Sequence, residues 1–391
     1  MTAVSNSSTA LTPQPRHQPE EKTMLYRKLG KTGYNVSQLG FGAMRLPMTG
    51  EDEKKQVNDE LAVPMIHRAF EAGVNYIDTA VMYCNHDSQR VVGKALKGWR
   101  DSIVLSTKNH YYGDSEKEWR QNLEDSLRLL DVECIDIYNN HGVSWQRYRD
   151  AIEPRIGKWM EKARDEGLIK HICFSMHDNN EGLMKLVDTG YPSVITLQYN
   201  MLDRQLEEGI AYAAENGIGI VVMGPVGGGR LGVPSDVLTQ AAQGVERVPE
   251  LALRFVLANP NVSVALSGMS TMQQVEENIR VASDPTALSE SDLEQIRSHL
   301  ERLDAMRDLY CTGCRYCLPC PADVDIPGVF AHYNLGRVYG LWEAAKQRYA
   351  GILRKNKGAD RCTECGQCEE KCPQNLAIRE DLKKAHAALR G

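Results

Sequence analysis

From Leu25 onward the sequence alternates short runs rich in β-branched and aromatic residues with longer amphipathic segments. Such alternation is typical of parallel strands joined by crossover helices. Several of the amphipathic segments end in Gly or Asn, as helix C-termini often do. The strand-like runs begin at Val36, Val74, Ile103, Cys134, Lys170, Val194, Ile218 and Val262. Eight strand–helix units predict an α/β fold of the (β/α)8 TIM-barrel type.

The size of the chain leaves room for a second, smaller module beside the barrel. It has 391 residues, 42% of them hydrophobic, and a net charge of −6. A barrel of this type takes about 250 residues. The sequence has no Lys/Arg stripe of the kind that binds nucleic acid, and no apolar run approaches the roughly 20 residues of a membrane helix. We therefore expect neither a nucleic-acid partner nor a membrane partner.

The N-terminal segment, residues 1–23, is rich in Ser, Thr, Pro and Gln and lacks the apolar core of a signal peptide, so we expect a disordered tail. Eight of the eleven cysteines fall in two tight clusters, and no export signal is visible. This pattern favours a reducing cytoplasmic location over a disulfide-forming one. We predict the barrel in residues 24–285, a linker helix in 286–310 and a second module in 311–391.

Polar residues stand at the ends of three consecutive predicted strands. Asp78 ends the second strand and is followed by Tyr83, Lys108 ends the third, and His141 follows the fourth. Each of them alone could be a surface or structural residue. In a barrel, however, chemistry takes place where the strands end, so the four side chains should converge over one mouth.

The four residue types fit carbonyl reduction. A tyrosine needs a neighbouring cation to act as a proton donor near neutral pH, and Lys108 can be that cation. Asp78 can hold the lysine, while a neutral His141 can orient the carbonyl oxygen that gathers negative charge as hydride arrives. We therefore interpret Asp78, Tyr83, Lys108 and His141 as candidate catalytic residues.

A glycine-rich segment, VGGGR from Val226 to Arg230, follows the seventh predicted strand. Barrels often bind phosphate at this position. The segment could equally be a tight turn. Its place in the barrel favours contacts of Gly227 and Arg230 with a cofactor pyrophosphate.

Ordered motifs between about Leu25 and Ala282 make this part of the chain resemble the aldo-keto reductases. In chain order they are LGFGAMRL, NYIDTA followed by Tyr83, STK, DIYNNHG, FSMH, LQYN and GMSTMQQVEEN. The resemblance implies that Tyr83 is the general acid, that the Lys108–Asp78 pair tunes it, and that His141 orients the substrate. It also implies cofactor contacts near Ser175, Gln198, Gly268, Ser270, Glu277 and Asn278.

The chain departs from this family at three cofactor positions. Relatives that prefer NADPH usually have basic residues near the start and middle of GMSTMQQVEEN, where this chain has Gly268 and Gln274. A 2′-phosphate would lack its usual partners, so we expect NAD(H) to bind at least as well as NADP(H). Met223 ends the seventh strand where many relatives have an aromatic residue that stacks on the nicotinamide. A flavin such as FMN stays open as an alternative.

Two cysteine runs close the chain. The second run, followed by Pro373, reproduces the C-x2-C-x2-C-x3-C-P pattern of two-cluster ferredoxins, in which the fourth cysteine ligates the other cluster. In the first run the spacing before the fourth cysteine is one residue shorter. Exchange of the fourth cysteines predicts one [4Fe–4S] cluster on Cys311, Cys314, Cys317 and Cys372. It predicts a second on Cys362, Cys365, Cys368 and Cys320.

Zinc is the alternative, because paired C-x2-C units also form tetrahedral zinc sites. Runs of four cysteines ending in Cys-Pro suit a cubane cluster better. Apolar residues between the two runs recur at helical spacing, which predicts a small, mainly α-helical ferredoxin-like domain. A capped helix beginning near Leu288 should join this domain to the barrel.

Together these features predict an oxidoreductase of aldo-keto reductase type that acts on a small-molecule carbonyl or alcohol. Nicotinamide passes two electrons as a hydride, whereas each cluster passes one, so exchange between them needs a step that splits the pair, usually at a flavin. A redox partner protein would complete such a path. The alternative is a catalytically silent redox-sensing or scaffold protein with structural clusters, in which the four candidate catalytic residues would be vestigial.

Overall fold

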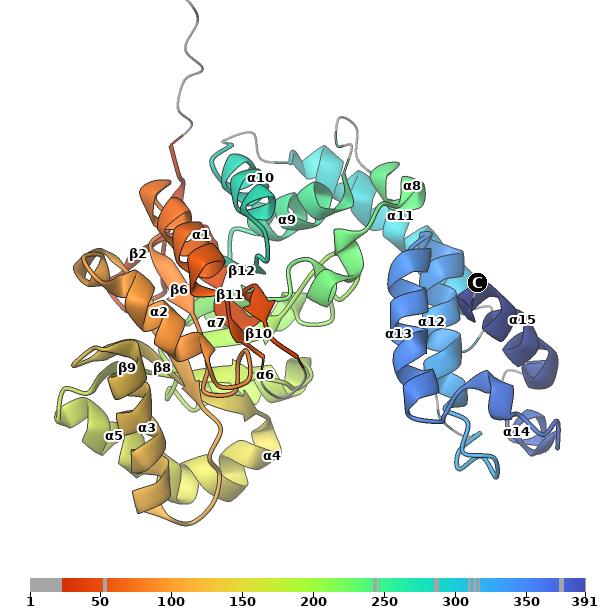
Figure 1. Cartoon of the computed structure of the whole chain (residues 1–391), viewed down its shortest axis with the longest axis horizontal. Helices are drawn as coiled ribbons and strands as arrows, with labels where there is room; N and C mark the ends of the chain where they lie inside the picture. The colour runs from red at the N-terminus through yellow and green to blue at the C-terminus, as the bar shows by residue number, and fades with distance from the viewer. Residues whose placement is uncertain are drawn as a thin grey trace, which may run out of the picture.

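The computed structural model describes residues 23–51, 55–241, 245, 247–284, 288–308, 311, 315, 317–372 and 376–390. Most of the predicted N-terminal tail and the predicted ligand Cys314 lie outside these residues, as does the side chain of Arg230. Figure 1 shows two bodies, a barrel wrapped by helices and a separate group of helices at the C-terminal end of the chain.

Eight parallel strands close into a barrel in the order β3, β6, β7, β8, β9, β10, β11, β12, so the predicted fold class is confirmed. Every one of the eight predicted runs contributes a strand. Their bounds are β3 Leu39–Gly42, β6 Tyr76–Asp78, β7 Val104–Asn109, β8 Ile135–Val143, β9 Ile169–Met176, β10 Val194–Gln198, β11 Gly219–Met223 and β12 Val264–Gly268.

The first predicted run differs from expectation because it divides in two. Its beginning forms β2 (Asn35–Ser37), which pairs antiparallel with β1 (Tyr26–Lys28), and only its second half enters the barrel as β3. The hydroxyl of Ser37 donates to the carbonyl of Leu39 at 2.6 Å, which turns the chain between the two strands. The hairpin brings Leu29 and Val36 onto buried residues such as Val104 near the starts of the barrel strands.

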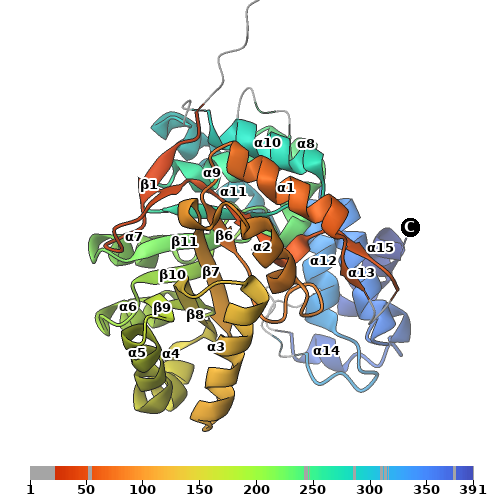
Figure 2. The same ribbon diagram turned by 60° about the vertical axis from the view of Figure 1, so that its left-hand side comes forward.

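Helices cover the outside of the barrel (Figures 1 and 2), and side chains mark where several of them begin. Asn58, Ser115, Asn179 and Thr271 each accept a hydrogen bond from a backbone N–H of the first turn. The helices are α1 Asp59–Glu71, α2 Ser88–Leu96, α3 Glu116–Leu130, α4 Trp145–Arg147, α5 Gly157–Asp165, α6 Asn180–Asp188, α7 Glu207–Glu215, α9 Val248–Ala258 and α10 Met272–Ala282.

A π-helical segment, η4 (Tyr148–Ile156), lies between α4 and α5. Pro154 is inside it, and proline has no N–H to donate to the preceding turn, which fits the altered hydrogen bonding there. Among the helices of the described residues, none is long and apolar enough to cross a bilayer.

The C-terminal part is helical, as predicted. The linker helix α11 (Glu290–Asp308) begins at a reciprocal cap, in which Ser289 N donates to Asp292 at 2.9 Å and Asp292 N donates to Ser289 Oγ at 3.1 Å. It leads to α12 Ile326–Tyr339, α13 Trp342–Arg354, α14 Gln367–Glu370 and α15 Ile378–Arg390. Both views show α12 and α13 side by side.

One segment of the barrel contacts both α11 and α12. Ser235 caps α8 (Asp236–Thr239) by accepting from Leu238 N, and its hydroxyl donates to the carbonyl of Tyr339 at 2.5 Å. A ring nitrogen of His299 in α11 lies 2.8 Å from the carbonyl of Val237. The chain between β11 and α9 therefore joins the barrel to the C-terminal helices.

Candidate active site

The structure places Asp78 and Lys108 in contact across two neighbouring strands. Asp78 ends β6, which pairs with β7, and the ammonium group of Lys108 donates to its carboxylate and, at 2.8 Å, to the carbonyl of Thr79. Ser106 donates to the second carboxylate oxygen at 2.7 Å. Burial opposes the charge of Lys108, but the nearby Asp78 and Tyr83 raise the pKa of its ammonium group. The result is a buried, paired cation.

Tyr83 and His141 stand next to this pair, so all four candidate catalytic residues lie together. Lys108 Nζ lies 4.7 Å from the centre of the Tyr83 ring, and the rings of Tyr83 and His141 meet edge to face with centres 6.1 Å apart. Burial, followed by the charges of Lys108 and neighbouring groups, lowers the pKa of His141 to about 3. Its imidazole is therefore neutral near pH 7, as expected from the sequence.

The loop that carries Tyr83 has an unusual backbone. Cys84, Asn85 and His86 are three successive non-glycine residues with positive φ, at 52°, 55° and 68°. This region disfavours side chains with a Cβ, so other contacts must hold the loop. The Cys84 thiol lies 3.6 Å from the carbonyl oxygen of Ala43, and burial raises its pKa. Cys84 thus acts as a buried protonated thiol that anchors the loop.

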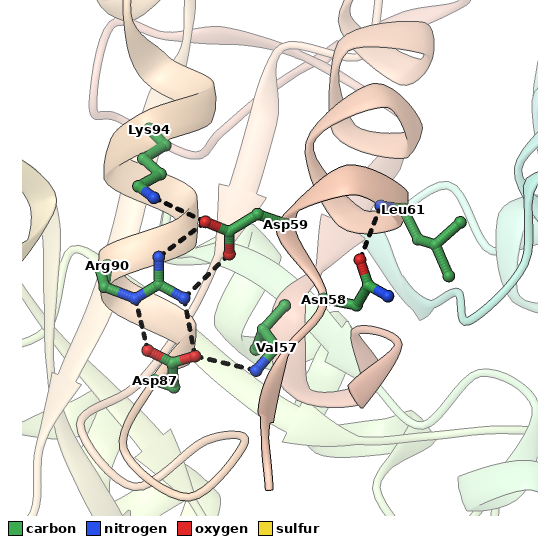
Figure 3. Close-up of polar contacts among 7 residues, drawn as sticks. All are labelled: Val57, Asn58, Asp59, Leu61, Asp87, Arg90 and Lys94. Atoms are coloured by element: carbon green, nitrogen blue, oxygen red, sulfur yellow. Dashed lines mark hydrogen bonds and ion pairs between the residues drawn. The ribbon is translucent and has the colours of Figure 1, made fainter. Parts of the chain in front are cut away.

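A charged network fixes the other end of this loop (Figure 3). Asp87 accepts from Val57 N at 2.8 Å and from Arg90 Nε at 2.6 Å. Arg90 also makes two hydrogen bonds to Asp59 in α1, and Lys94 donates to the same carboxylate. The C-terminal end of the loop after β6 is therefore tied through Arg90 of α2 to Asp59 of α1.

Three candidate cofactor residues lie on neighbouring strands. Gln198 and Met223 pair with each other in β10 and β11, and Ser175 in β9 pairs with Thr196 in β10. The hydroxyl of Ser175 is buried and has no hydrogen-bond partner in the described part of the protein. An unpaired buried hydroxyl costs stability, which fits a polar ligand group bound against it.

Five further candidate cofactor residues lie between the end of β12 and α10, where several are engaged within the chain; they are Gly268, Ser270, Gln274, Glu277 and Asn278. Gln274 accepts from the backbone N–H of Ser270 at 2.8 Å, and Asn278 donates to Ser267 at 2.9 Å. Glu277 forms an ion pair with Arg247, which helps to lower the pKa of its carboxyl against the effect of burial. Gly268 is the last residue of β12.

Arg45 is a cation at this site that the sequence interpretation missed. Its guanidinium donates to the carbonyl of Gly228 at 3.0 Å, and its carbonyl accepts from Ser270 Oγ at 2.7 Å. A side chain at Gly268 would come within 3.2 Å of the Arg45 side chain. Gly228 thus lies at the guanidinium of Arg45, and Gly268 lies against the aliphatic part of the same side chain. The signal in the sequence was a basic residue three positions after Gly42, the last residue of the first barrel strand.

The C-terminal helices enclose a cavity lined by cysteines. Cys320 from the first run lies there with Cys362, Cys365 and Cys368 from the second, as the predicted exchange of ligands requires, and Cys317 lines it as well. All ten described cysteines are free thiols. Cys311 and Cys372 are partly buried against the hydrophobic core. The four cysteines of the second predicted ligand set line the cavity together.

The arrangement of these thiols bears on the zinc alternative. Within the described residues, no three His, Cys, Asp or Glu side chains converge as the ligands of a single metal ion would. Instead, thiols surround a space between Cys320 and the second run.

Comparison with known proteins decides the family. The model of the aldo/keto reductase family matches residues 38–236 and 236–301. The chain belongs to this family. A second model, that of the 4Fe-4S dicluster domain, matches residues 310–377 and covers both cysteine runs. The protein is therefore an aldo/keto reductase with a C-terminal iron–sulfur domain, and the resemblance stated from the sequence is confirmed.

Several known proteins are similar to this chain over about 70% of its length. An uncharacterized oxidoreductase of Bacillus subtilis, YqkF, is 28% identical over 71% of this chain and 97% of its own length. L-galactose dehydrogenase of Arabidopsis thaliana is 27% identical over 70% of this chain and 94% of its own. The solved structure of aldo-keto reductase AKR11C1 from Bacillus halodurans, in its holo form, is 30% identical with a TM-score of 0.60, over 71% of this chain and 96% of that one.

Proposed function

We propose that this aldo/keto reductase interconverts a small-molecule carbonyl compound and its alcohol with NAD(H) or NADP(H) bound at the barrel mouth. The observation that carries the proposal is the buried Lys108–Asp78 pair beside the ring of Tyr83. A buried ion pair is costly to form and gives little net stability. Its position next to a tyrosine is explained by proton transfer and not by folding.

The side chains have distinct roles in this proposal. A bound nicotinamide supplies the hydride. Tyr83 donates its hydroxyl proton to the carbonyl oxygen as the alcohol forms, and Lys108 stabilises the resulting phenolate. His141, neutral because of its low pKa, donates an N–H hydrogen bond to the same oxygen. In the oxidative direction each of these transfers is reversed.

Two features support a dinucleotide at the mouth. The unpaired hydroxyl of Ser175 offers a hydrogen bond to a carboxamide, and Arg45 offers a cation to a phosphate beside Gly228 and Gly268. From the sequence, a 2′-phosphate of NADP(H) was expected to lack a basic partner, because Gly268 and Gln274 are uncharged. Arg45 supplies a positive charge close to Gly268, so NADP(H) is no longer expected to be disfavoured. We infer that either dinucleotide binds.

For the C-terminal domain we infer two [4Fe–4S] clusters, and their exchange of electrons with a nicotinamide in the barrel would require a bound flavin that splits the hydride pair into single electrons. The grouping of Cys320 with Cys362, Cys365 and Cys368 supports the ligand set of one of them. A redox partner protein would take or give these electrons.

The proposal is tested by incubating the anaerobically purified holoprotein with an aldehyde and either NADH or NADPH, and by extracting its cofactors. Oxidation of the dinucleotide with formation of the alcohol is the expected result. Failure of both dinucleotides over a range of aldehydes and alcohols would favour the alternative of a silent scaffold, and recovery of FMN would place a flavin in the barrel.

A further inference from the structure

A second arginine stands at the barrel mouth, on the side formed by the loops after β7 and β8. Arg147 belongs to α4, the short helix that directly follows β8 and its residue His141. One guanidinium nitrogen of Arg147 donates to the carbonyl of Gly142, the residue next to His141. The guanidinium carbon also lies 4.6 Å from the centre of the Tyr112 ring, in the loop after β7. The cation is therefore fixed between two loops of the mouth.

The loop that carries Tyr112, whose ring contacts Arg147, is held in place by further contacts. Arg155 in η4 donates to the carbonyl of Tyr112 at 3.1 Å and to that of Gly113 at 3.2 Å. The guanidinium of Arg155 forms an ion pair with Asp114 at 2.9 Å. Stacking on an aromatic face holds a guanidinium in place without neutralising it. The orientation of Arg147 is thus set by contacts that leave its charge available.

The charge of Arg147 is not balanced within the described part of the chain. Its two neighbouring arginines are paired: Arg149 lies 2.7 Å from Glu153, and Arg155 pairs with Asp114. No carboxylate among the described residues forms an ion pair with Arg147, which is exposed. An exposed cation that keeps a fixed position without an acidic partner is suited to an anion from outside the chain.

The charged groups around His141 also favour an anion on this side of the mouth. After burial, the groups that act most strongly on its imidazole are Lys108, His177, His110 and Arg147, and all four lower its pKa. This side of the mouth therefore combines a fixed positive charge with several imidazoles. A negatively charged ligand group would be favoured there.

We propose that Arg147 forms an anion subsite of the mouth, and that the substrate is an aldehyde or ketone carrying a carboxylate or phosphate group. This deepens the proposed function and rests on it for the carbonyl half of the substrate. The guanidinium binds the anionic group while the carbonyl lies against Tyr83 and His141. Arg147 acts as a specificity-determining residue and takes no part in the proton transfer.

The test uses matched aldehydes and the holoprotein. 4-Carboxybenzaldehyde is compared with benzaldehyde, and glyceraldehyde 3-phosphate with glyceraldehyde, by the ratio of kcat/KM within each pair. In Arg147→Met this ratio should fall by about tenfold to a hundredfold, the value of one charge-assisted contact, and mostly through KM. Arg147→Lys should keep part of the preference because it keeps the charge but not the planar fork.

Arg149→Met is the matched control, because it removes a cation from the same segment that is already paired with Glu153. Arg149→Met should leave the ratio of kcat/KM between charged and uncharged aldehydes the same as in the unaltered protein. The preference of the unaltered protein for the charged aldehydes should also weaken as salt is added. The pair that shows the larger preference tells whether the subsite takes carboxylate or phosphate.

Binding separates this inference from the proposed function. Calorimetric titration with 4-(hydroxymethyl)benzoate and with benzyl alcohol needs no turnover. If no aldehyde is reduced but the carboxylated alcohol binds in an Arg147-dependent way, the subsite stands and the proposed reaction fails. Equal binding of the two alcohols, or a charge preference that survives in Arg147→Met, would overturn the subsite.

Discussion

The ammonium group of Lys108 lies 4.7 Å from the centre of the Tyr83 ring while it donates to the carboxylate of Asp78. Tyr83 reaches this position on a loop of three left-handed residues, whereas Lys108 and Asp78 are fixed by the barrel itself. A strained loop therefore positions the Tyr83 ring next to the Lys108–Asp78 ion pair, which the barrel strands hold in place. This relationship can be tested at each of its members.

Tyr83→Phe should lower the rate of carbonyl reduction by about 10²- to 10⁴-fold, the usual loss for a general acid. The fold and the clusters should be preserved, because the hydroxyl makes no contact with the C-terminal domain in this proposal. Initial rates with an aldehyde would be measured beside the thermal melting curve and the cluster absorbance. Reduction at an undiminished rate would remove Tyr83 from the mechanism.

Lys108→Met should destabilise the barrel by about 3–5 kcal/mol, because it leaves the buried Asp78 carboxylate without its cation. The double variant Asp78→Leu/Lys108→Met should recover much of this loss, since it removes both charges. Anaerobic urea unfolding followed by circular dichroism would give the three free energies of unfolding. A double variant less stable than Lys108→Met would show that the pair contributes stability beyond charge compensation.

The pKa of His141, about 3 in the folded protein, lies below its value in the unfolded chain, about 6.5. The folded state therefore binds this proton less readily, so the contribution of His141 to stability is full above pH 6.5 and declines as pH falls toward 3. Carbonyl reduction should accordingly show no step near pH 6.5 that depends on His141. A step near that pH which disappears in His141→Gln would contradict the neutral assignment.

Arg45→Met should weaken dinucleotide binding by about 1.5–3 kcal/mol, the contribution of a charge-assisted hydrogen bond, and NADPH more than NADH. The reason is that Arg45 lies against Gly268 and Gly228 where phosphate groups are proposed to bind. Fluorescence titration of both dinucleotides gives the Kd values. Arg128→Met, which removes an exposed arginine paired with Asp125, serves as the control. Equal affinities in Arg45→Met and the unaltered protein would place the phosphates elsewhere.

Cys365→Ser should lose about half of the bound iron, because Cys365 is a predicted ligand of one of two clusters. Electron exchange with a viologen dye should then be abolished, while nicotinamide-linked reduction of an aldehyde persists in part. Cys134→Ser, a cysteine outside both runs, should change neither. Clusters of the unaltered protein that stay oxidised while the barrel cofactor is reduced would mean that they are structural.

The sequence by itself determined the barrel and the meeting of the four candidate catalytic residues. Strand and helix periodicities are local, and the carboxyl ends of parallel strands meet at one face, so Asp78, Lys108 and His141 could be placed together from their positions at strand ends alone. The split of the first predicted run at Ser37 was not foreseen, because it depends on a side-chain hydrogen bond to the chain two residues on.

The grouping of Cys320 with the second cysteine run was also predictable, since cluster ligation imposes fixed spacings. Contacts between side chains distant in the sequence were not. Arg45 meets Gly228 across 183 residues, and Arg147 stacks on Tyr112 from another loop. These contacts depend on how loops pack once the barrel has closed, and a loop sequence carries no period from which its packing could be inferred. Tertiary structure alone therefore decided that Arg45 and Arg147 stand at the mouth.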